Sequence, residues 1–161
     1  MAEIEIQNDS DYDVVPERLE AAAKATLQAQ AAPEGCALTI ALTPDEMVQG
    51  LNQQFRGIDA PTDILSFPSG IQPPGYLGDL VIAFPYASAQ AAREGHALMD
   101  SLALLVVHGT LHLLGYDHDT PEKRAAMWAA QETVLHMLGI SPDIVPALEG
   151  DTEHDDHDQA Q

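Results

Sequence analysis

The sequence predicts an α+β fold, because strand-like segments cluster before residue 84 and helix-like segments dominate the rest of the chain. A length of 161 residues suits one domain that is large enough to bury its own core. The hydrophobic content of 45% is typical of a globular protein. We therefore expect one domain over residues 1–145, followed by an acidic, disordered tail over residues 146–161.

The first four elements follow from local patterns. Residues 2–7 alternate between apolar and polar side chains, which predicts a strand. Residues 16–31 begin with proline and repeat apolar residues at helical spacing, which predicts a helix. Residues 37–42 predict a second strand. Thr43 and Pro44 then have the character of a helix cap and a first helical residue, and this second helix is expected to run to about Phe55.

The middle of the chain predicts a β-hairpin and a short helix. Residues 64–67 and 77–84 are strand-like, and the loop at 69–75 between them is rich in proline and glycine. Residues 85–94 are rich in alanine and are expected to form a helix that Gly95 ends.

Two longer helices complete the predicted domain. The apolar run at 102–107 predicts a buried helix that continues to His112. Thr120 and Pro121 are suited to start a last helix, and Gly139 is suited to end it.

The end of the chain differs in composition from the rest. From Glu149 onward there are six acids, no base and few apolar residues, which is typical of a disordered segment. His154 and His157 lie in this segment, and we assign them no catalytic role.

Charge and cysteine content limit the classes of protein to consider. Six Lys and Arg against 26 Asp and Glu give a formal net charge of −20, which disfavours long-range attraction to nucleic acid or to an acidic membrane. The single cysteine, Cys36, excludes an internal disulfide and is expected to be a small buried residue entering a strand. Residues 1–9 lack the features of a signal peptide, and no apolar run approaches the length of about 18 residues that a membrane helix needs. These observations predict a soluble, cytoplasmic protein.

The segment HGTLHLLGYDH is the strongest candidate for a functional site. It places His108, His112 and His118 in the pattern His-x3-His-x5-His, with Gly115 between the second and the third. Residues four apart share a helix face with Cβ atoms about 5–6 Å apart, so His108 and His112 can reach one ion. Gly115 is suited to end the helix and to reverse the chain, which can carry His118 back to that ion. Three imidazoles on a tetrahedral ion leave one position for water, the pattern of a catalytic zinc site.

The same skeleton resembles the zinc motif H-E-x-x-H-x-x-G-x-x-H of the metzincin proteases. The three histidines and the glycine are in register, but Gly109 stands where a peptidase needs its glutamate base. The pattern therefore favours a metal site, while peptide hydrolysis would need another carboxylate that approaches in space.

Other polar residues near the motif have two interpretations. Asp117 and Asp119 could accept a hydrogen bond from the outer ring nitrogen of a ligand histidine, or Asp119 could serve only as a turn residue before the last helix. His96 and His136 are isolated and lack ligand spacing, so we interpret them as structural or exposed.

Three segments together resemble the YbeY family of bacterial metal-dependent endoribonucleases. They are HGTLHLLGYDH, the upstream FRGIDAPTDILSFP at 55–68 and GDLVIA at 78–83, and the order of elements agrees over roughly residues 1–140. The resemblance implies a mixed sheet of about four strands packed with about five helices, and one zinc ion per chain. It also implies cleavage of single-stranded RNA, in the maturation of the 3′ end of 16S ribosomal RNA and in ribosome quality control.

The resemblance assigns roles to particular residues. His108, His112 and His118 match the metal ligands, and Arg56 matches a functional arginine, so Arg56 and His108 are the expected catalytic residues. A zinc-bound water with a pKa of about 7 would supply the nucleophile, and Arg56 would stabilise charge on the phosphate. The simpler role for Arg56 is to offset a helix dipole. The chain departs from the family pattern nearby, because Ile58 and Ala60 stand where many members carry lysines.

Three functions from different classes remain open at this point. The first is a zinc-dependent endoribonuclease with ribosomal RNA and small ribosomal subunit proteins as partners, and with neither DNA nor a membrane. The second is a metalloprotease with metzincin-like site geometry. The third is a ribosome-associated binding module with a structural zinc, which the net charge of −20 favours because a protein partner would avoid repulsion from RNA. Three histidines also accept nickel, cobalt or copper.

Overall fold

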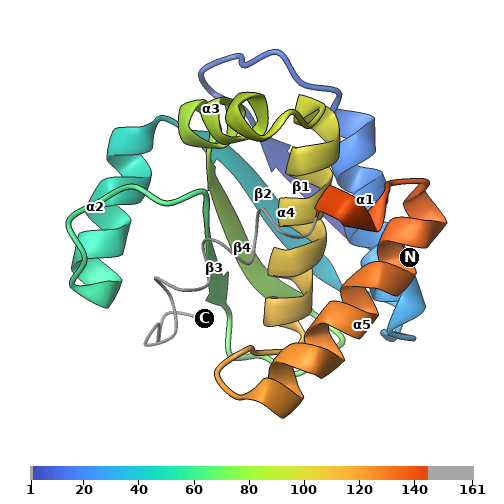
Figure 1. Ribbon diagram of the computed structural model, residues 1–161. Helices are drawn as coiled ribbons and strands as arrows, with labels where there is room; N and C mark the ends of the chain where they lie inside the picture. Colours follow the sequence, from blue (N-terminus) through green and yellow to red (C-terminus); the bar gives the residue numbers. More distant parts are fainter. Residues whose placement is uncertain (1, 145–161) are drawn as a thin grey trace.

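Four strands form one mixed sheet with helices on both of its faces (Figure 1). The computed structural model describes residues 2–144. In chain order the elements are β1 Glu3–Gln7, α1 Pro16–Ala29, β2 Ala37–Thr43, α2 Asp45–Arg56, β3 Ile64–Pro68, β4 Tyr76–Ala83, α3 Phe84–Glu94, α4 Leu98–Leu113, α5 Pro121–Leu138 and the 3-10 helix η1 Pro142–Ile144. The α+β fold with about four strands and about five helices is confirmed. The acidic tail expected at 146–161, with His154 and His157, lies outside the described residues.

The sheet has the strand order β1-β2-β4-β3. β1, β2 and β4 are parallel, and β3 pairs antiparallel with β4 at the edge, so the predicted hairpin of β3 and β4 is present. The parallel pairs need crossovers, and α1 supplies the one between β1 and β2. The hairpin leaves β3 as an edge strand next to the helix that carries the histidines.

Alternation along the strands divides the core between the two faces of the sheet. Leu80 and Ile82 of β4 belong to the larger core cluster, together with buried residues of α1, α4 and α5. Their neighbours Val81 and Ala83 belong to a smaller cluster with Val48 of α2. Successive side chains of a strand point to opposite faces, so α4 and α2 cover opposite faces. Figure 1 shows α4 across the sheet and α2 set apart beside β3.

The boundary between β2 and α2 differs from the one predicted. Thr43 was expected to cap the second helix, but it is the last residue of β2, and its hydroxyl donates to the carbonyl of Ile82 at 3.2 Å. Pro44 is the N-cap instead, because pairing with β4 extends the strand through Thr43. Thr120 does cap α5, since its hydroxyl oxygen accepts from the backbone N–H of Lys123 at 3.1 Å.

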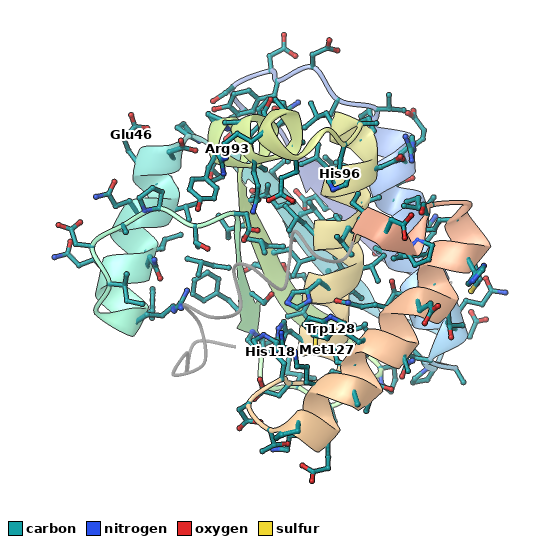
Figure 2. All side chains as sticks on the ribbon, viewed as in Figure 1. Glu46, Arg93, His96, His118, Met127 and Trp128 are labelled. Atoms are coloured by element: carbon teal, nitrogen blue, oxygen red, sulfur yellow. The ribbon has the colours of Figure 1, made fainter. Side chains whose placement is uncertain are left out.

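Single residues outside the site lie where they were expected. Cys36 is buried directly before β2. His136 is exposed on α5, and His96 is partly exposed in the turn between α3 and α4 (Figure 2). No single helix among residues 2–144 is long and apolar enough to cross a membrane; α3 and α4 pass that test only as a pair, which is bent by 118°.

Candidate metal centre

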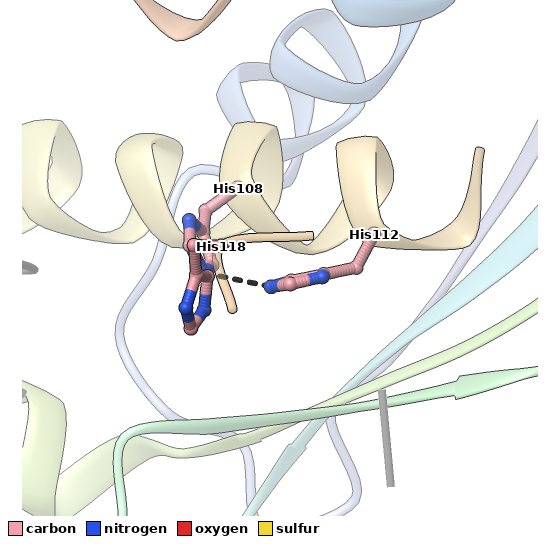
Figure 3. Close-up of side chains that lie close together, drawn as sticks. All are labelled: His108, His112 and His118. Atoms are coloured by element: carbon pink, nitrogen blue, oxygen red, sulfur yellow. Dashed lines mark hydrogen bonds between the residues drawn. The ribbon is translucent and has the colours of Figure 1, made fainter. Parts of the chain in front are cut away.

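Three imidazoles converge beside the last turns of α4 (Figure 3). His108 and His112 project from consecutive turns of α4, and His118 reaches the same point from the loop that follows. One ligand nitrogen of each ring lies within 4.8 Å of the corresponding nitrogens of the other two. His108 and His112 are only 6% and 4% exposed. The sequence prediction that these three residues come together is therefore met in the fold.

The loop geometry depends on Gly115. α4 ends at Leu113, and Gly115 adopts a φ of +105°, a backbone conformation that side chains with a Cβ rarely adopt. Its N–H donates to the carbonyl of His112 at 3.0 Å, and the N–H of Tyr116 donates to the carbonyl of Leu111 at 3.0 Å. These bonds close the end of the helix and turn the chain back, which brings His118 to the other two rings.

Two acceptor oxygens hold the outer nitrogens of the helical histidines. Nδ1 of His112 donates to the backbone carbonyl of Tyr116 at 2.9 Å, and Nδ1 of His108 donates to Oε1 of Gln131 at 2.6 Å. A carbonyl oxygen can only accept, so each ring carries its proton on Nδ1 and a lone pair on Nε2. The two Nε2 atoms lie 3.1 Å apart, along the dashed line in Figure 3. With both ring protons on Nδ1, neither Nε2 atom can donate a hydrogen bond along this line. The two lone pairs then repel each other, and a shared cation would remove the repulsion.

The spacing of these nitrogens fits a divalent metal ion. Tetrahedral zinc with bonds of 2.0–2.1 Å places two ligand nitrogens about 3.3 Å apart, close to the 3.1 Å between the Nε2 atoms of His108 and His112. Within residues 2–144 the cluster contains three ligand side chains and no fourth. A fourth tetrahedral position would then remain for solvent, as in catalytic zinc sites.

Burial keeps the two helical imidazoles neutral. Desolvation lowers the pKa of His108 well below its usual value, and the neighbouring His112 adds to the effect. Desolvation also lowers the pKa of His112 to about 4, with His118 as the next cause. Neutral imidazoles have a lone pair available for a metal, so protons do not compete for these two ligands near pH 7.

The metal-free protein is expected to lose stability as the pH falls from about 6.5 toward 4. In this window an unfolded chain protonates histidine at its usual pKa of about 6.5, whereas folded His112, with a pKa of about 4, stays neutral. The unfolded state then binds more protons, so the free energy of unfolding rises with pH across the window and levels off above it. His112 alone accounts for about 3 kcal/mol, and His108 acts in the same direction.

Urea unfolding at several pH values in the presence of a chelator measures this dependence. Carboxylates also titrate in the window, so the comparison is with His112→Leu, which should show a shallower slope, and with His136→Leu at an exposed position, which should keep the wild-type slope. Equal slopes in all three proteins would contradict the prediction.

Helix α5 forms one wall of the cluster. Trp128 packs edge-on against His108 and against His118, with ring centroids 5.9 Å apart in both pairs, and Figure 2 shows Trp128 beside His118. The guanidinium carbon of Arg124 lies 5.2 Å from the centre of the Trp128 ring. Neither Trp128 nor Gln131 was identified from the sequence. The sequence signal that could have identified Gln131 was a glutamine within the apolar pattern of the last helix, four residues after the buried Met127.

The two aspartates beside His118 do not hold the rings of the helical histidines. Asp117 accepts from the backbone N–H of His118 at 2.8 Å, and Asp119 pairs with Lys123 at 3.5 Å. The outer nitrogens of His108 and His112 are bound by Gln131 and by the carbonyl of Tyr116 instead. Asp117 thus orients the backbone of the third histidine, and Asp119 is a turn residue before α5.

Gly109 lies at the contact between α4 and the sheet. A Cβ at this position would lie 2.7 Å from Cδ2 of Leu80 and 3.1 Å from Cδ1 of Ile64. The position that carries the glutamate base of a metzincin protease therefore faces the sheet here and has no space for a side chain. This contact argues against peptide hydrolysis by the usual route.

Gly109→Ala is expected to lower the free energy of unfolding by about 1–3 kcal/mol, although alanine favours helix more than glycine does. The reason is the overpacking against Leu80. Gly50→Ala in α2 is the matched control, because its Cβ would meet nothing within 4 Å, and it should stabilise by about 0.5–1 kcal/mol. Urea denaturation measures both changes, and stabilisation of both variants would contradict the close packing of α4 on the sheet.

Arg56 is the last residue of α2 and is half-buried. Gly57 follows it with a φ of +74° and ends the helix. The structure thus leaves both roles considered for Arg56 compatible with its position.

The family model and the relatives in sequence agree on one family. The family model described as "Endoribonuclease YbeY" matches residues 4–139. The endoribonuclease YbeY of Chloroflexus aurantiacus is 44% identical over 147 residues, covering 85% of this chain and 96% of that protein. That of Moorella thermoacetica is 42% identical over 153 residues, covering 86% and 98%. The solution structure of TM1509 from Thermotoga maritima shares the fold, with a TM-score of 0.57 and 22% identity over 99% of this chain and 97% of that one.

Proposed function

Since the chain belongs to the YbeY endoribonuclease family, we propose that its cleavage of RNA depends on zinc at His108, His112 and His118 and is directed at single strands. The proposal includes 3′-end maturation of 16S ribosomal RNA and ribosome quality control in the cytoplasm, with small ribosomal subunit proteins as further partners. Residues 1–145 would form the single catalytic domain, and residues 146–161 the acidic tail. The observation that carries the proposal is the convergence of three imidazoles, each with one ligand nitrogen within 4.8 Å of those of the other two.

The chain's own residues would prepare the site for phosphodiester hydrolysis. His108 and His112 offer Nε2, and His118 completes the ligand set from the loop. Zinc held there supplies a water with a pKa of about 7 and a Lewis acid for a phosphoryl oxygen. This chemistry needs no glutamate base, which agrees with the packed position of Gly109.

Arg56 would stabilise negative charge on the phosphate that is cleaved. Its planar guanidinium stays protonated and can bind two phosphate oxygens at once. It is the only base between Lys24 and Arg93, so local rather than long-range attraction would hold the RNA. The adjacent Phe55 is 53% exposed, with its ring centroid 5.3 Å from that of Phe67. The exposed ring of Phe55, held against the partly buried Phe67, offers a stacking surface for an unpaired base, which supports the preference for single strands.

The formal charge of −20 favours one alternative. In that alternative the chain reaches the ribosome through a protein partner, and its zinc mainly stabilises the fold. Long-range repulsion from RNA would then matter little, because the partner brings the two together.

Cleavage assays with matched substrates test the proposed function. A single-stranded RNA, the same RNA in a duplex and an unfolded protein are each incubated with the purified protein, with chelator and with chelator followed by excess zinc. We expect only the single strand to be cut, cleavage to stop with chelator and zinc to restore it. Cleavage that persists in chelator would overturn the metal dependence. Absence of turnover together with chelator-induced unfolding would support the structural-zinc alternative.

A further inference from the structure

Gln131 of α5 is a buried amide whose oxygen is directed at the candidate metal centre. The residue is 0% exposed, and its Oε1 accepts from Nδ1 of His108 at 2.6 Å. Among residues 2–144 no atom accepts a hydrogen bond from its amide nitrogen, Nε2. An apolar residue of similar shape would avoid leaving a buried donor without a partner. The packing of α5 therefore does not require a glutamine at position 131. What a glutamine provides there and an apolar residue would not is the hydrogen bond to His108.

The orientation of this amide decides which nitrogen of His108 can bind a metal. With the oxygen toward Nδ1, the ring proton stays on Nδ1 and the Nε2 lone pair faces Nε2 of His112, 3.1 Å away. With the amide reversed, an N–H of Gln131 would require a lone pair on Nδ1, and the ring proton would move to Nε2. That proton would point into the cluster and would block the position of an ion.

Oε1 of Gln131, which accepts the hydrogen bond from Nδ1 of His108, belongs to a neutral amide. Histidines that bind metals usually give their outer N–H to a carboxylate, a backbone carbonyl or water. In this site a side-chain amide serves His108, and a backbone carbonyl serves His112. Neither acceptor adds negative charge, so a divalent ion on three neutral imidazoles would keep its full charge for polarising water and phosphate.

We propose that Gln131 is a positioning residue, which keeps the proton of His108 on Nδ1 and directs the Nε2 lone pair at the metal without adding charge. This inference rests on the proposed function, because it requires the three histidines to hold an ion. Trp128, one turn earlier on α5, packs against the same ring with centroids 5.9 Å apart and limits its rotation. Together the two residues make α5 the support of His108.

Gln131→Met tests the proposal through metal affinity rather than activity alone. Methionine has a similar shape but no acceptor oxygen, so we expect the affinity for Co²⁺ to fall by about 10–100-fold. The thermal stability of the metal-free variant should stay close to that of the wild type, because removal of the unpartnered amide nitrogen offsets the loss of the acceptor for Nδ1 of His108. Trp128 is the chain's single tryptophan and lies beside two of the ligands, so quenching of its fluorescence by Co²⁺ reports binding directly.

Two further variants separate positioning from packing. Val134→Ala removes buried volume at a fully buried position on the same helix, so it should lower thermal stability and leave Co²⁺ affinity unchanged. Gln131→Glu keeps an acceptor and adds charge, so it should retain the affinity while the pH profile of cleavage shifts to higher pH. If Gln131→Met binds Co²⁺ as tightly as the wild type does, the inference is overturned. If the wild type itself binds no Co²⁺, the proposed metal function fails instead.

Discussion

Replacing His112 with alanine is expected to remove metal binding and RNA cleavage together. His112 supplies one of three ligand nitrogens, and its Nε2 lies 3.1 Å from that of His108. Loss of a residue that only supports a ligand costs about 10–100-fold in affinity, so loss of a ligand itself should cost more than about 100-fold. Isothermal titration with zinc and cleavage of a single-stranded RNA measure the two effects on the same preparation.

A second histidine provides the control for this experiment. His136→Ala changes an exposed histidine on α5 outside the cluster and should leave both metal binding and cleavage unchanged. Zinc should raise the melting temperature of the wild type and of His136→Ala, because a ligand that binds only the folded state stabilises it, but not that of His112→Ala. Cleavage by His112→Ala at the wild-type rate, with its fold intact, would show that the three histidines are not the active centre.

Arg56→Ala is expected to lower kcat/KM for RNA by about 10²–10³-fold, while zinc content stays at the wild-type level. The loss would arise because a positioned cation that stabilises developing charge on the phosphate is gone. Arg56→Lys keeps the charge but not the planar fork, so it should show an intermediate rate. The melting temperature should change little, because a cation in the last turn of a helix contributes only about 0.3–1 kcal/mol.

Arg93 is a control for the position of Arg56 at a helix end, although Arg93 is exposed and Arg56 is half-buried. Each lies in the last turn of its helix, and each helix ends at a glycine in the left-handed region, Gly57 or Gly95. Arg93→Ala should therefore reproduce the small loss of the helix-dipole interaction without a loss of cleavage. Equal cleavage by the two alanine variants would leave Arg56 with the helix-dipole role alone.

The parts of this protein that could be predicted from its sequence depend on local spacing. His108 and His112 are one helical turn apart, so the 3.6-residue repeat brings their rings together once the segment is helical. Gly115 marks the reversal because a left-handed conformation favours a residue without Cβ. The alternation of Leu80 and Ile82 with Val81 and Ala83 follows from the two-residue repeat of a strand. The limits of an element were less certain, since pairing with β4 extended β2 through Thr43.

The local pattern thus determined the fold class, the helices and strands and the three converging histidines. Only the tertiary structure decided what surrounds them. Gln131 binds His108 from 23 positions away, and Gly109 meets Leu80 across the interface of helix and sheet. Such contacts depend on how α5 and the sheet pack against α4, and no periodicity within a single segment records that packing. The three converging histidines could therefore be found from spacing, whereas the residues that contact them from other elements could be found only from the folded chain.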